Sequence, residues 1–195
     1  MQLILVRHGE TDSNQKGTYL GWTDVILNEN GVKQAHCAGE KLKEERIDGL
    51  FSSPLKRCLQ TAEIINESHN RDIICSDALK EQNFGIWDNL THKEVVGRFP
   101  EEYREYTVNW VDYCIAEGES PRQAFERVAA FTDRLLEDSG GKGTYVIVTH
   151  LGCIRNIIAH LLGLGIEGSW RFRVGNGSVT RIAINDENYA YLNIF

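Results

Sequence analysis

Apolar residues along this chain fall into short runs and helix-spaced series that alternate with one another. The short runs are typical of strands, and the least interrupted of them of strands covered on both faces. They lie at 3–6, 49–52, 73–75 and 145–149. The helix-spaced series predict helices over 29–46, from Pro54 onward, over 121–138 and directly after position 150.

Each predicted helix has one apolar face that is expected to cover the sheet. In chain order these faces are Val32, Ala35, Gly39 and Leu42; Leu55, Leu59, Ala62 and Ile65; Ala124, Val128, Phe131 and Leu135; and Ile154, Ile157, Ile158 and Leu161. Gly140 and Gly141 are expected to end the third helix.

Two parts of the chain are less regular. The stretch at about 80–120 is rich in aromatic residues but has no sustained period, and we expect it to cap the substrate site. The tail after Trp170 alternates polar and apolar positions around Asn176-Gly177, which predicts a hairpin, and ends in an apolar segment at 191–194.

Strands that alternate with helices predict an α/β fold with a mostly parallel sheet and helices on both faces, that is, a three-layer α/β/α sandwich. A length of 195 residues favours a single domain over 1–195. The formal net charge of −7 argues against a nucleic-acid binder, so an anionic substrate would need a local cluster of cations.

The sequence indicates neither a membrane-spanning segment nor disulfide bonds. No apolar run approaches the length that spans a bilayer, and the N-terminal residues lack the pattern of a signal peptide, so we expect a cytoplasmic protein. The five cysteines are isolated and odd in number, which favours neither a disulfide framework nor a zinc site. A cysteine nucleophile at Cys58 or Cys153, each near an arginine in sequence, is a weaker hypothesis.

Polar side chains with catalytic potential follow the predicted strands. Arg7 and His8 come directly after the first apolar run, and His150 comes directly after the run at 145–149. Arg57 falls in the first turn of the helix that Pro54 opens. Because parallel strands end at one edge of a sheet, these groups are expected to meet there. Guanidinium groups suit a phosphate monoester, and a neutral imidazole can attack phosphorus.

A proton donor for the leaving oxygen is also needed, and Glu81 is our candidate because it precedes the stretch Asn83-Phe84-Gly85. A carboxylic acid can act at neutral pH if its surroundings raise its pKa. Glu94, Glu117 and Glu119 lie in the same region and are alternatives.

The chain resembles the histidine phosphatase superfamily, which includes the phosphoglycerate mutases, in the residues described above and in several further motifs. The first two matching motifs are LVRHGET at 5–11 with Asn14, and SSPLKR at 52–57 with QTA at 60–62. The later ones are Gly21 with Asp24 and Leu27, Gly31 with Gln34-Ala35, Glu81 with FGIW at 84–87, GES at 118–120 with Arg127-Val128, and His150 with Arg155. These motifs occur in family order across nearly the whole chain.

The resemblance implies a role for each matching residue. His8 would be the phosphorylated nucleophile, Arg7, Arg57 and His150 would hold the phosphoryl group, and Glu81 would protonate the leaving group and then activate water. Asn14 and Thr11 would add hydrogen bonds, and Gly9, Gly21 and Leu151 complete the predicted phosphate and substrate site, with Gly9 and Gly152 allowing the backbone to approach the ligand. No metal and no cofactor is implied. The expected partner is a small-molecule phosphate monoester, bound by a monomer or homodimer.

The chain departs from the family pattern at two places. Leu151 stands where the family often has Gly after the second histidine, and Trp87-Asp88-Asn89 stands where Trp-Glu-Gly is frequent. Neither change removes a charged catalytic group, so both bear on substrate fit.

The modest length of the 80–120 region favours a phosphatase over a mutase, and the pattern is most similar to α-ribazole-5′-phosphate phosphatases of cobalamin synthesis. Broad-specificity and sugar-phosphate phosphatases, phosphoglycerate mutases and a non-catalytic phosphate-binding regulator are the alternatives.

Overall fold

The computed structural model describes residues 1–187 and 189–193. Within them the strands form one six-stranded sheet with the order β3-β2-β4-β1-β5-β6. The first four strands in this order are parallel, and β5 and β6 are antiparallel to their neighbours. The strands are β1 Gln2–Arg7, β2 Gly49–Ser52, β3 Ile73–Cys75, β4 Thr144–Thr149, β5 Val179–Ile184 and β6 Ala190–Asn193. The prediction of a mostly parallel sheet is confirmed.

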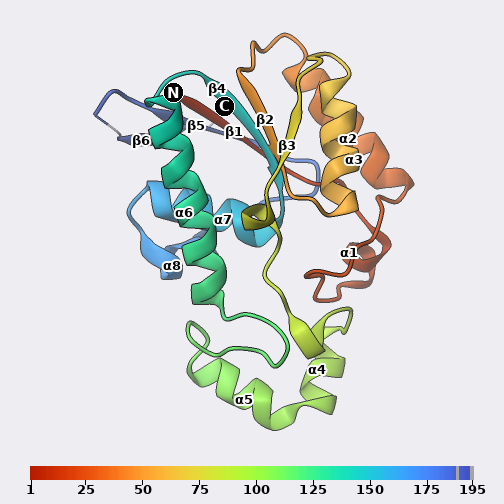
Figure 1. Cartoon of the computed structure of the whole chain (residues 1–195). Helices are drawn as coiled ribbons and strands as arrows, with labels where there is room; N and C mark the ends of the chain where they lie inside the picture. The colour runs from red at the N-terminus through yellow and green to blue at the C-terminus, as the bar shows by residue number, and fades with distance from the viewer. Residues whose placement is uncertain (188, 194–195) are drawn as a thin grey trace.

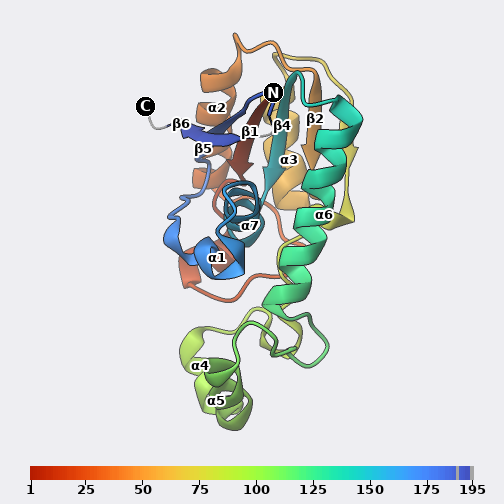
Figure 2. The same cartoon turned by 90° about the vertical axis from the view of Figure 1, so that its left-hand side faces the viewer.

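Helices cover both faces of this sheet (Figure 1, Figure 2). The side chains of β1 alternate between the two faces, as the period of two in a strand requires. Ile4 and Val6 pack in a cluster with α2 and α3, whereas Leu3 and Leu5 pack in a second cluster with α6 and α7. These helices span Glu29–Leu42, Lys56–Asn66, Pro121–Ser139 and Leu151–Leu161. The three-layer α/β/α sandwich is therefore confirmed.

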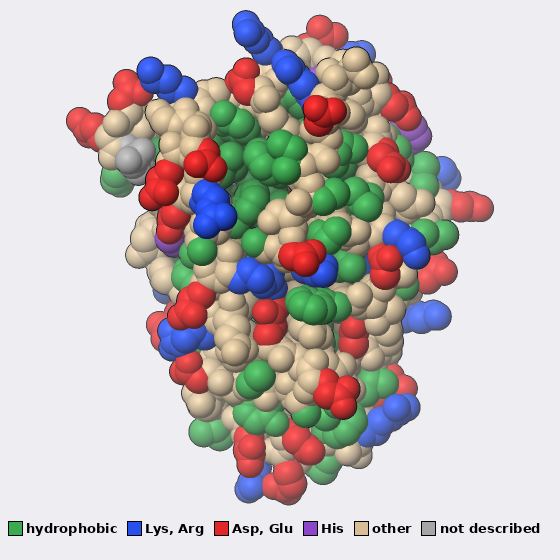
Figure 3. Space-filling view, in the orientation of Figure 1, with side chains coloured by type: hydrophobic (Ala, Val, Ile, Leu, Met, Phe, Trp, Pro, Cys, Tyr) green, Lys and Arg blue, Asp and Glu red, His purple; other side chains and the backbone are tan. Residues whose placement is uncertain are grey.

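The face turned to the viewer in Figure 3 carries apolar side chains over β2, β3 and β4 beside α6, and both signs of charge are interspersed around them. Ile74 on β3 is exposed, and Phe51 and Phe131 are half-buried in edge-to-face contact there. No helix within the described residues is both long and apolar enough to cross a membrane.

A small cap stands away from the sheet, at the bottom of Figures 1 and 2. It contains the helices α4, His92–Arg98, and α5, Pro100–Val108, packed around the buried side chain of Trp87. The prediction of an irregular 80–120 region missed both helices. The apolar period of α5 is weak, and none of its side chains is fully buried. For α4 a signal existed, because Thr91 and Glu94 form a capping box.

Two predicted helix boundaries and one predicted face residue in the first half of the chain differ from the structure. Helix α2 ends at Leu42 because residues 43–46 are all charged and supply no apolar side chain to its buried face. Val32 is exposed, and Ala38 takes its place on that face. Pro54 precedes α3 by two residues instead of opening it.

The predicted hairpin at Asn176-Gly177 is wrong. The hairpin lies later, between β5 and β6, and is closed by a hydrogen bond from the Asn185 N–H to the Tyr189 carbonyl. Strand β6 ends at Asn193, and Ile194 of the predicted terminal segment lies outside the described residues. The remaining short helices are α1 Asp12–Lys16 and α8 Gly165–Gly168, with 3-10 turns at Asp77–Leu79, Gly85–Trp87 and Ser169–Arg171.

Candidate active site

The two histidines meet at the carboxyl edge of the sheet, as the sequence predicts. Strands β1 and β4 are neighbours with Arg7 paired to Thr149, so His8 and His150 follow at matching positions. The backbone N–H of His8 donates to the carbonyl of Thr149 at 3.0 Å. The two imidazole rings lie edge to face with centroids 5.1 Å apart.

One ring nitrogen of His8 has a hydrogen-bond partner within the protein. Its Nδ1 lies 2.7 Å from the carbonyl oxygen of Gly9, which can only accept, so Nδ1 carries the proton and Nε2 keeps its lone pair when the ring is neutral. Burial, together with the positive charges of Arg57 and Arg7, lowers the pKa of His8 well below its usual value. The ring is therefore neutral at pH 7, as a nucleophile must be.

His150 is fully buried and uses both ring nitrogens within the protein. The Nε–H of Arg57 donates to Nδ1 at 3.2 Å, so Nε2 carries the proton and donates to the Ser53 hydroxyl at 2.8 Å. Burial, and then the positive charge of Arg57, lowers the pKa of His150 well below its usual value. This histidine is a neutral neighbour of His8.

Arg57 is also fully buried, and it contacts protein groups on all three nitrogens. Besides its contact with His150, it donates to the carbonyl of Thr23 at 2.9 Å and to that of Gly21 at 2.7 Å. Its location beside both histidines agrees with the prediction. It does not line the open pocket described below.

The departure at Asp88-Asn89 has a structural explanation. The carboxylate of Asp88 accepts hydrogen bonds from the backbone N–H groups of Gly21 and Thr23, whose carbonyls in turn accept from Arg57. The shorter acid thus holds the loop that fixes Arg57. Asn89 adopts the left-handed conformation, φ +64°, which asparagine tolerates better than most residues and which explains why glycine is frequent there.

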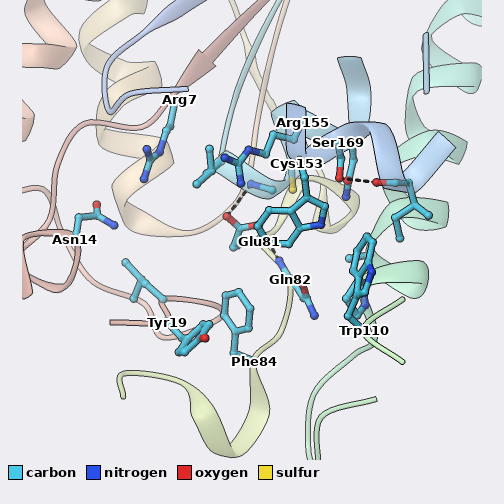
Figure 4. A pocket seen from close by; sticks show the side chains of 18 of the residues that line it. Arg7, Asn14, Tyr19, Glu81, Gln82, Phe84, Trp110, Cys153, Arg155 and Ser169 are labelled. Carbon is cyan, nitrogen blue, oxygen red and sulfur yellow. Dashed lines mark hydrogen bonds between the residues drawn. The ribbon is translucent and has the colours of Figure 1, made fainter. Parts of the chain in front are cut away.

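Arg7 and Glu81 border the open space in front of His8. Arg7 donates through Nη1 to the carbonyl of Val174 at 2.7 Å, and its Nε is buried without a hydrogen-bond partner among the described residues. Glu81 accepts from the backbone N–H of Gln82 at 3.0 Å and from that of Gly152 at 3.1 Å. The guanidinium of Arg7 and the carboxylate of Glu81 thus both line the pocket that His8 lines (Figure 4).

The other glutamates of the region have different partners. Glu94 caps α4 through Thr91, Glu119 pairs with Arg127, and Glu117 is exposed. None of the three lines the pocket, so Glu81 is the one candidate among these four for a proton donor.

The pocket has a volume of about 290 Å³ and lies between the sheet edge and the cap. Of the predicted phosphate- and substrate-binding residues, Asn14 and Leu151 line it, whereas Gly9, Thr11 and Gly21 do not. A Cβ on Gly9 would lie 2.2 Å from the carbonyl oxygen of Gly31, so this glycine permits close packing of two loops. Thr11 caps α1, and Gly21 packs against the 82–84 backbone.

The cysteines do not form a competing nucleophile. Cys58 and Cys153 are both fully buried, and burial raises the pKa of each thiol, to about 12 for Cys153. Their arginine neighbours lower these pKa values by less than burial raises them. No group of three or more His, Cys, Asp or Glu side chains within residues 1–187 and 189–193 is arranged to hold a metal ion.

Comparison with known proteins identifies the family. The model of the histidine phosphatase superfamily, branch 1, matches residues 3–194. This chain belongs to the histidine phosphatase superfamily. It is accordingly an enzyme of the phosphatase class.

Relatives of this histidine phosphatase carry several names. Phosphoserine phosphatase 1 of Hydrogenobacter thermophilus is 32% identical over all of this chain and 92% of its own length. Adenosylcobalamin/alpha-ribazole phosphatase of Escherichia coli is 30% identical over 96% of this chain and 92% of its own. The crystal structure of the alpha-ribazole phosphatase from Shigella flexneri is 30% identical, with a TM-score of 0.93 over all of this chain and 95% of that one.

Several pocket residues of this phosphatase were not assigned a role from the sequence. Arg155 on α7 donates through Nε to the carbonyl of Phe172 and lies 5.3 Å from the ring centroid of Trp170. Trp170 in turn meets Trp110 of the cap edge to face, with ring centroids 5.9 Å apart. Arg155 was named only as part of a matching motif, although its place four residues after Leu151 on the same helix face indicates that it also faces the pocket. Trp170 lies on a short 3-10 turn and gave no periodic signal.

The Asn176-Gly177 turn belongs to the active site of this phosphatase instead of to a hairpin. The side-chain amide of Asn176 donates to the carbonyl of His8 at 3.2 Å and to Asn14 Oδ1 at 3.1 Å. The backbone N–H of Gly177 is shared between the carbonyls of Arg7 and His8. The turn therefore fixes the backbone of His8.

Proposed function

We propose that this histidine phosphatase hydrolyses phosphate monoesters through a covalent phosphohistidine on Nε2 of His8, without a metal ion, and that its substrate is α-ribazole 5′-phosphate. The observation that carries the proposal is the state of His8: a buried, neutral imidazole whose Nδ1–H is fixed on the Gly9 carbonyl. Its free lone pair is therefore on Nε2.

The reaction has two steps. In the first, Nε2 of His8 attacks phosphorus, the ester P–O bond breaks, and Glu81 gives its proton to the leaving alkoxide. In the second, Glu81 takes a proton from water, whose oxygen attacks phosphorus and releases phosphate with the imidazole as leaving group.

The positive charge and the hydrogen-bond donors that this reaction needs come from three side chains, of which the two arginines carry the charge. Arg7 borders the pocket, and its buried Nε has no hydrogen-bond partner within the described residues, which supports a role for its guanidinium in binding the phosphoryl oxygens. Arg57 and His150 have all their nitrogens on protein groups, so the proposal requires their side chains to reorient when a phosphoryl group binds. The charge of Arg57 and the ring of His150 already lie beside His8.

The proposed substrate rests on the walls of the pocket. Aromatic side chains border the side away from Arg7: Tyr19, Phe84, Tyr106, Trp110 and Trp170. Edge-to-face and stacked contacts with such rings favour an aromatic group on the leaving alcohol. The benzimidazole of α-ribazole 5′-phosphate is such a group, and relatives at 30–31% identity carry this substrate in their names.

Phosphoserine is a second candidate. The 32%-identical relative from Hydrogenobacter thermophilus is named a phosphoserine phosphatase. Arg155 supports this alternative, because its guanidinium lines the pocket and could pair with a substrate carboxylate.

The test is phosphate release by wild type and His8→Ala, with a chelator present, from α-ribazole 5′-phosphate, phosphoserine, 3-phosphoglycerate, several sugar phosphates and an aryl phosphate. We expect the highest kcat/KM on α-ribazole 5′-phosphate and none of this activity in His8→Ala. A clear preference for phosphoserine or a sugar phosphate would replace the substrate but keep the reaction. Activity that requires a bisphosphate primer would indicate a mutase, and silence with all substrates a binding protein.

A further inference from the structure

The segment that carries Glu81 is held by a single arginine on α6. The Nη1 of Arg127 donates to the carbonyl of Ala78 at 2.8 Å and to that of Lys80 at 2.9 Å. Its Nη2 lies 3.4 Å from the carbonyl of Glu81 itself. One planar guanidinium thus contacts three carbonyls within four residues, a geometry that lysine cannot reproduce.

Glu119 completes this arrangement from the other side. Its Oε1 accepts from Nη2 of Arg127 at 2.5 Å and from the backbone N–H of Asn83 at 2.9 Å. Its own backbone carbonyl accepts from the side chain of Gln82 at 3.1 Å. Residues 78–83 are therefore tied at both ends to one Arg–Glu pair.

The pair is mostly buried, with side-chain exposures of 21% for Arg127 and 15% for Glu119, yet neither residue lines the pocket. Burying two charges costs desolvation free energy, so such a pair is weak evidence for a contribution to stability alone. The groups that the Arg127–Glu119 pair contacts say more about its role. Apart from each other, these two side chains donate to or accept from the backbone of residues 78–83.

The position of the Glu81 carboxylate depends on this segment. The carboxylate oxygens of Glu81 have two backbone N–H partners, Gln82 and Gly152, and no side-chain partner among the described residues. Its location therefore follows from its own backbone, and a displacement of about 1 Å can cost on the order of 100-fold in rate.

We infer that Arg127, held by Glu119, is a positioning residue that sets the carboxyl group of Glu81 at the distance from the leaving oxygen that proton transfer needs. This inference rests on the proposed role of Glu81 as the proton donor.

The test compares two esters with Arg127→Gln, Glu81→Gln and the double variant. One ester is α-ribazole 5′-phosphate, an alkyl phosphate that needs a proton donor, and the other is p-nitrophenyl phosphate, which does not. We expect Arg127→Gln to lower kcat/KM about 10-fold or more on the alkyl ester but less than about 3-fold on the aryl ester, because kcat/KM reports the steps up to release of the alcohol and not the later attack of water, which is the same for both esters. The double variant should be no slower than Glu81→Gln on the alkyl ester, because both changes remove the same proton transfer.

Arg122→Gln is the matched control, since Arg122 is on the same helix and its ion pair with Asp112 is on the surface. It should leave the ratio of the two esters unchanged. Thermal unfolding establishes that each variant is folded at the assay temperature. If Arg127→Gln does not fold, Glu119→Gln is used in its place, because it removes the charge while keeping an acceptor for the Asn83 N–H, and the same ester difference is expected.

An equal fall of kcat/KM on both esters in a folded Arg127 or Glu119 variant, or a fall that adds to that of Glu81→Gln, would overturn the inference. If Glu81→Gln itself lowers kcat/KM equally on both esters, the proton-donor role fails first, and the positioning role fails with it. His8→Ala reports separately on the phosphohistidine route.

Discussion

The carboxylate of Glu81 lies directly against Gly152, two residues beyond His150. Its Oε2 accepts the N–H of Gly152 at 3.1 Å, and a Cβ built on Gly152 would lie 2.4 Å from Oε1. Glycine at this position therefore permits the close approach of Glu81 to the start of α7. The leucine at 151, by contrast, leaves that approach free and contributes to the pocket wall.

Substitution of this glycine should displace the carboxylate. Because nothing can remain 2.4 Å from a Cβ, Gly152→Ala is expected to move Glu81 and to slow alkyl phosphates about 10-fold or more. Steady-state kinetics on an alkyl and an aryl ester measure this. Gly97→Ala is the control, since a Cβ there would have no described atom within 4 Å beyond its own helix and the site is helical. An active Gly152→Ala enzyme would mean that Glu81 has no fixed position.

The two buried histidines should make stability depend on pH. Burial lowers the pKa of both His8 and His150, so below pH 6.5 the unfolded state binds more protons than the folded state. The free energy of unfolding is then not reduced by these histidines above pH 6.5. It falls as the pH drops below 6.5, by up to about 1.4 kcal/mol per pH unit for each histidine. Urea unfolding at pH 7.5 and 5.5 measures this. His150→Gln should flatten the slope, and an unchanged slope would contradict the neutral, buried state.

Arg57→Lys should cost both activity and stability although the charge is kept. The guanidinium satisfies three acceptors, on His150, Thr23 and Gly21, and a lysine amine at one point cannot reach all three. Unsatisfied buried carbonyls cost about 1–3 kcal/mol each. Denaturant unfolding and kcat/KM measure the two losses. Arg122→Lys on the surface should show neither, and full activity of Arg57→Lys would remove Arg57 from the site.

The aromatic pair at the pocket should select the leaving group. Trp170→Ala removes a ring that contacts both Trp110 and Arg155, so we expect KM for α-ribazole 5′-phosphate to rise about 5- to 30-fold, as a loss of about 1–2 kcal/mol implies. KM for glycerol phosphate, which has no ring, should change less than about 2-fold. Tyr191→Ala, an exposed aromatic on β6, is the control. Equal effects on both substrates would argue against an aromatic subsite.

The sequence predicts the sheet and the two histidines because their signals are local. The apolar runs of β1 and β4 fix where the strands end, and parallel pairing then places Arg7, His8 and His150 together. Arg57 is also found this way, through its place in the first turn of α3.

Other features depend on contacts between distant segments and have no such signal. Gly9 faces Gly31 and Gly21 faces the 82–84 backbone, so their need for glycine is visible only in the fold. The Asn176-Gly177 turn has the residues of a hairpin, but long-range hydrogen bonds to the backbone of His8 decide its place. Trp170 reaches the pocket from a 3-10 turn that is too short to show a period.

The central claim is that Nε2 of His8 carries the phosphoryl group, and it can be tested by trapping the intermediate. The enzyme is mixed with excess α-ribazole 5′-phosphate, quenched in alkali, where phosphohistidine survives, and digested for mass spectrometry and phosphorus NMR. We expect one phosphate on His8, attached at Nε2 because Nδ1 donates to Gly9, and none in His8→Ala. Turnover without any phosphate on His8, or phosphate attached at Nδ1, would contradict the account.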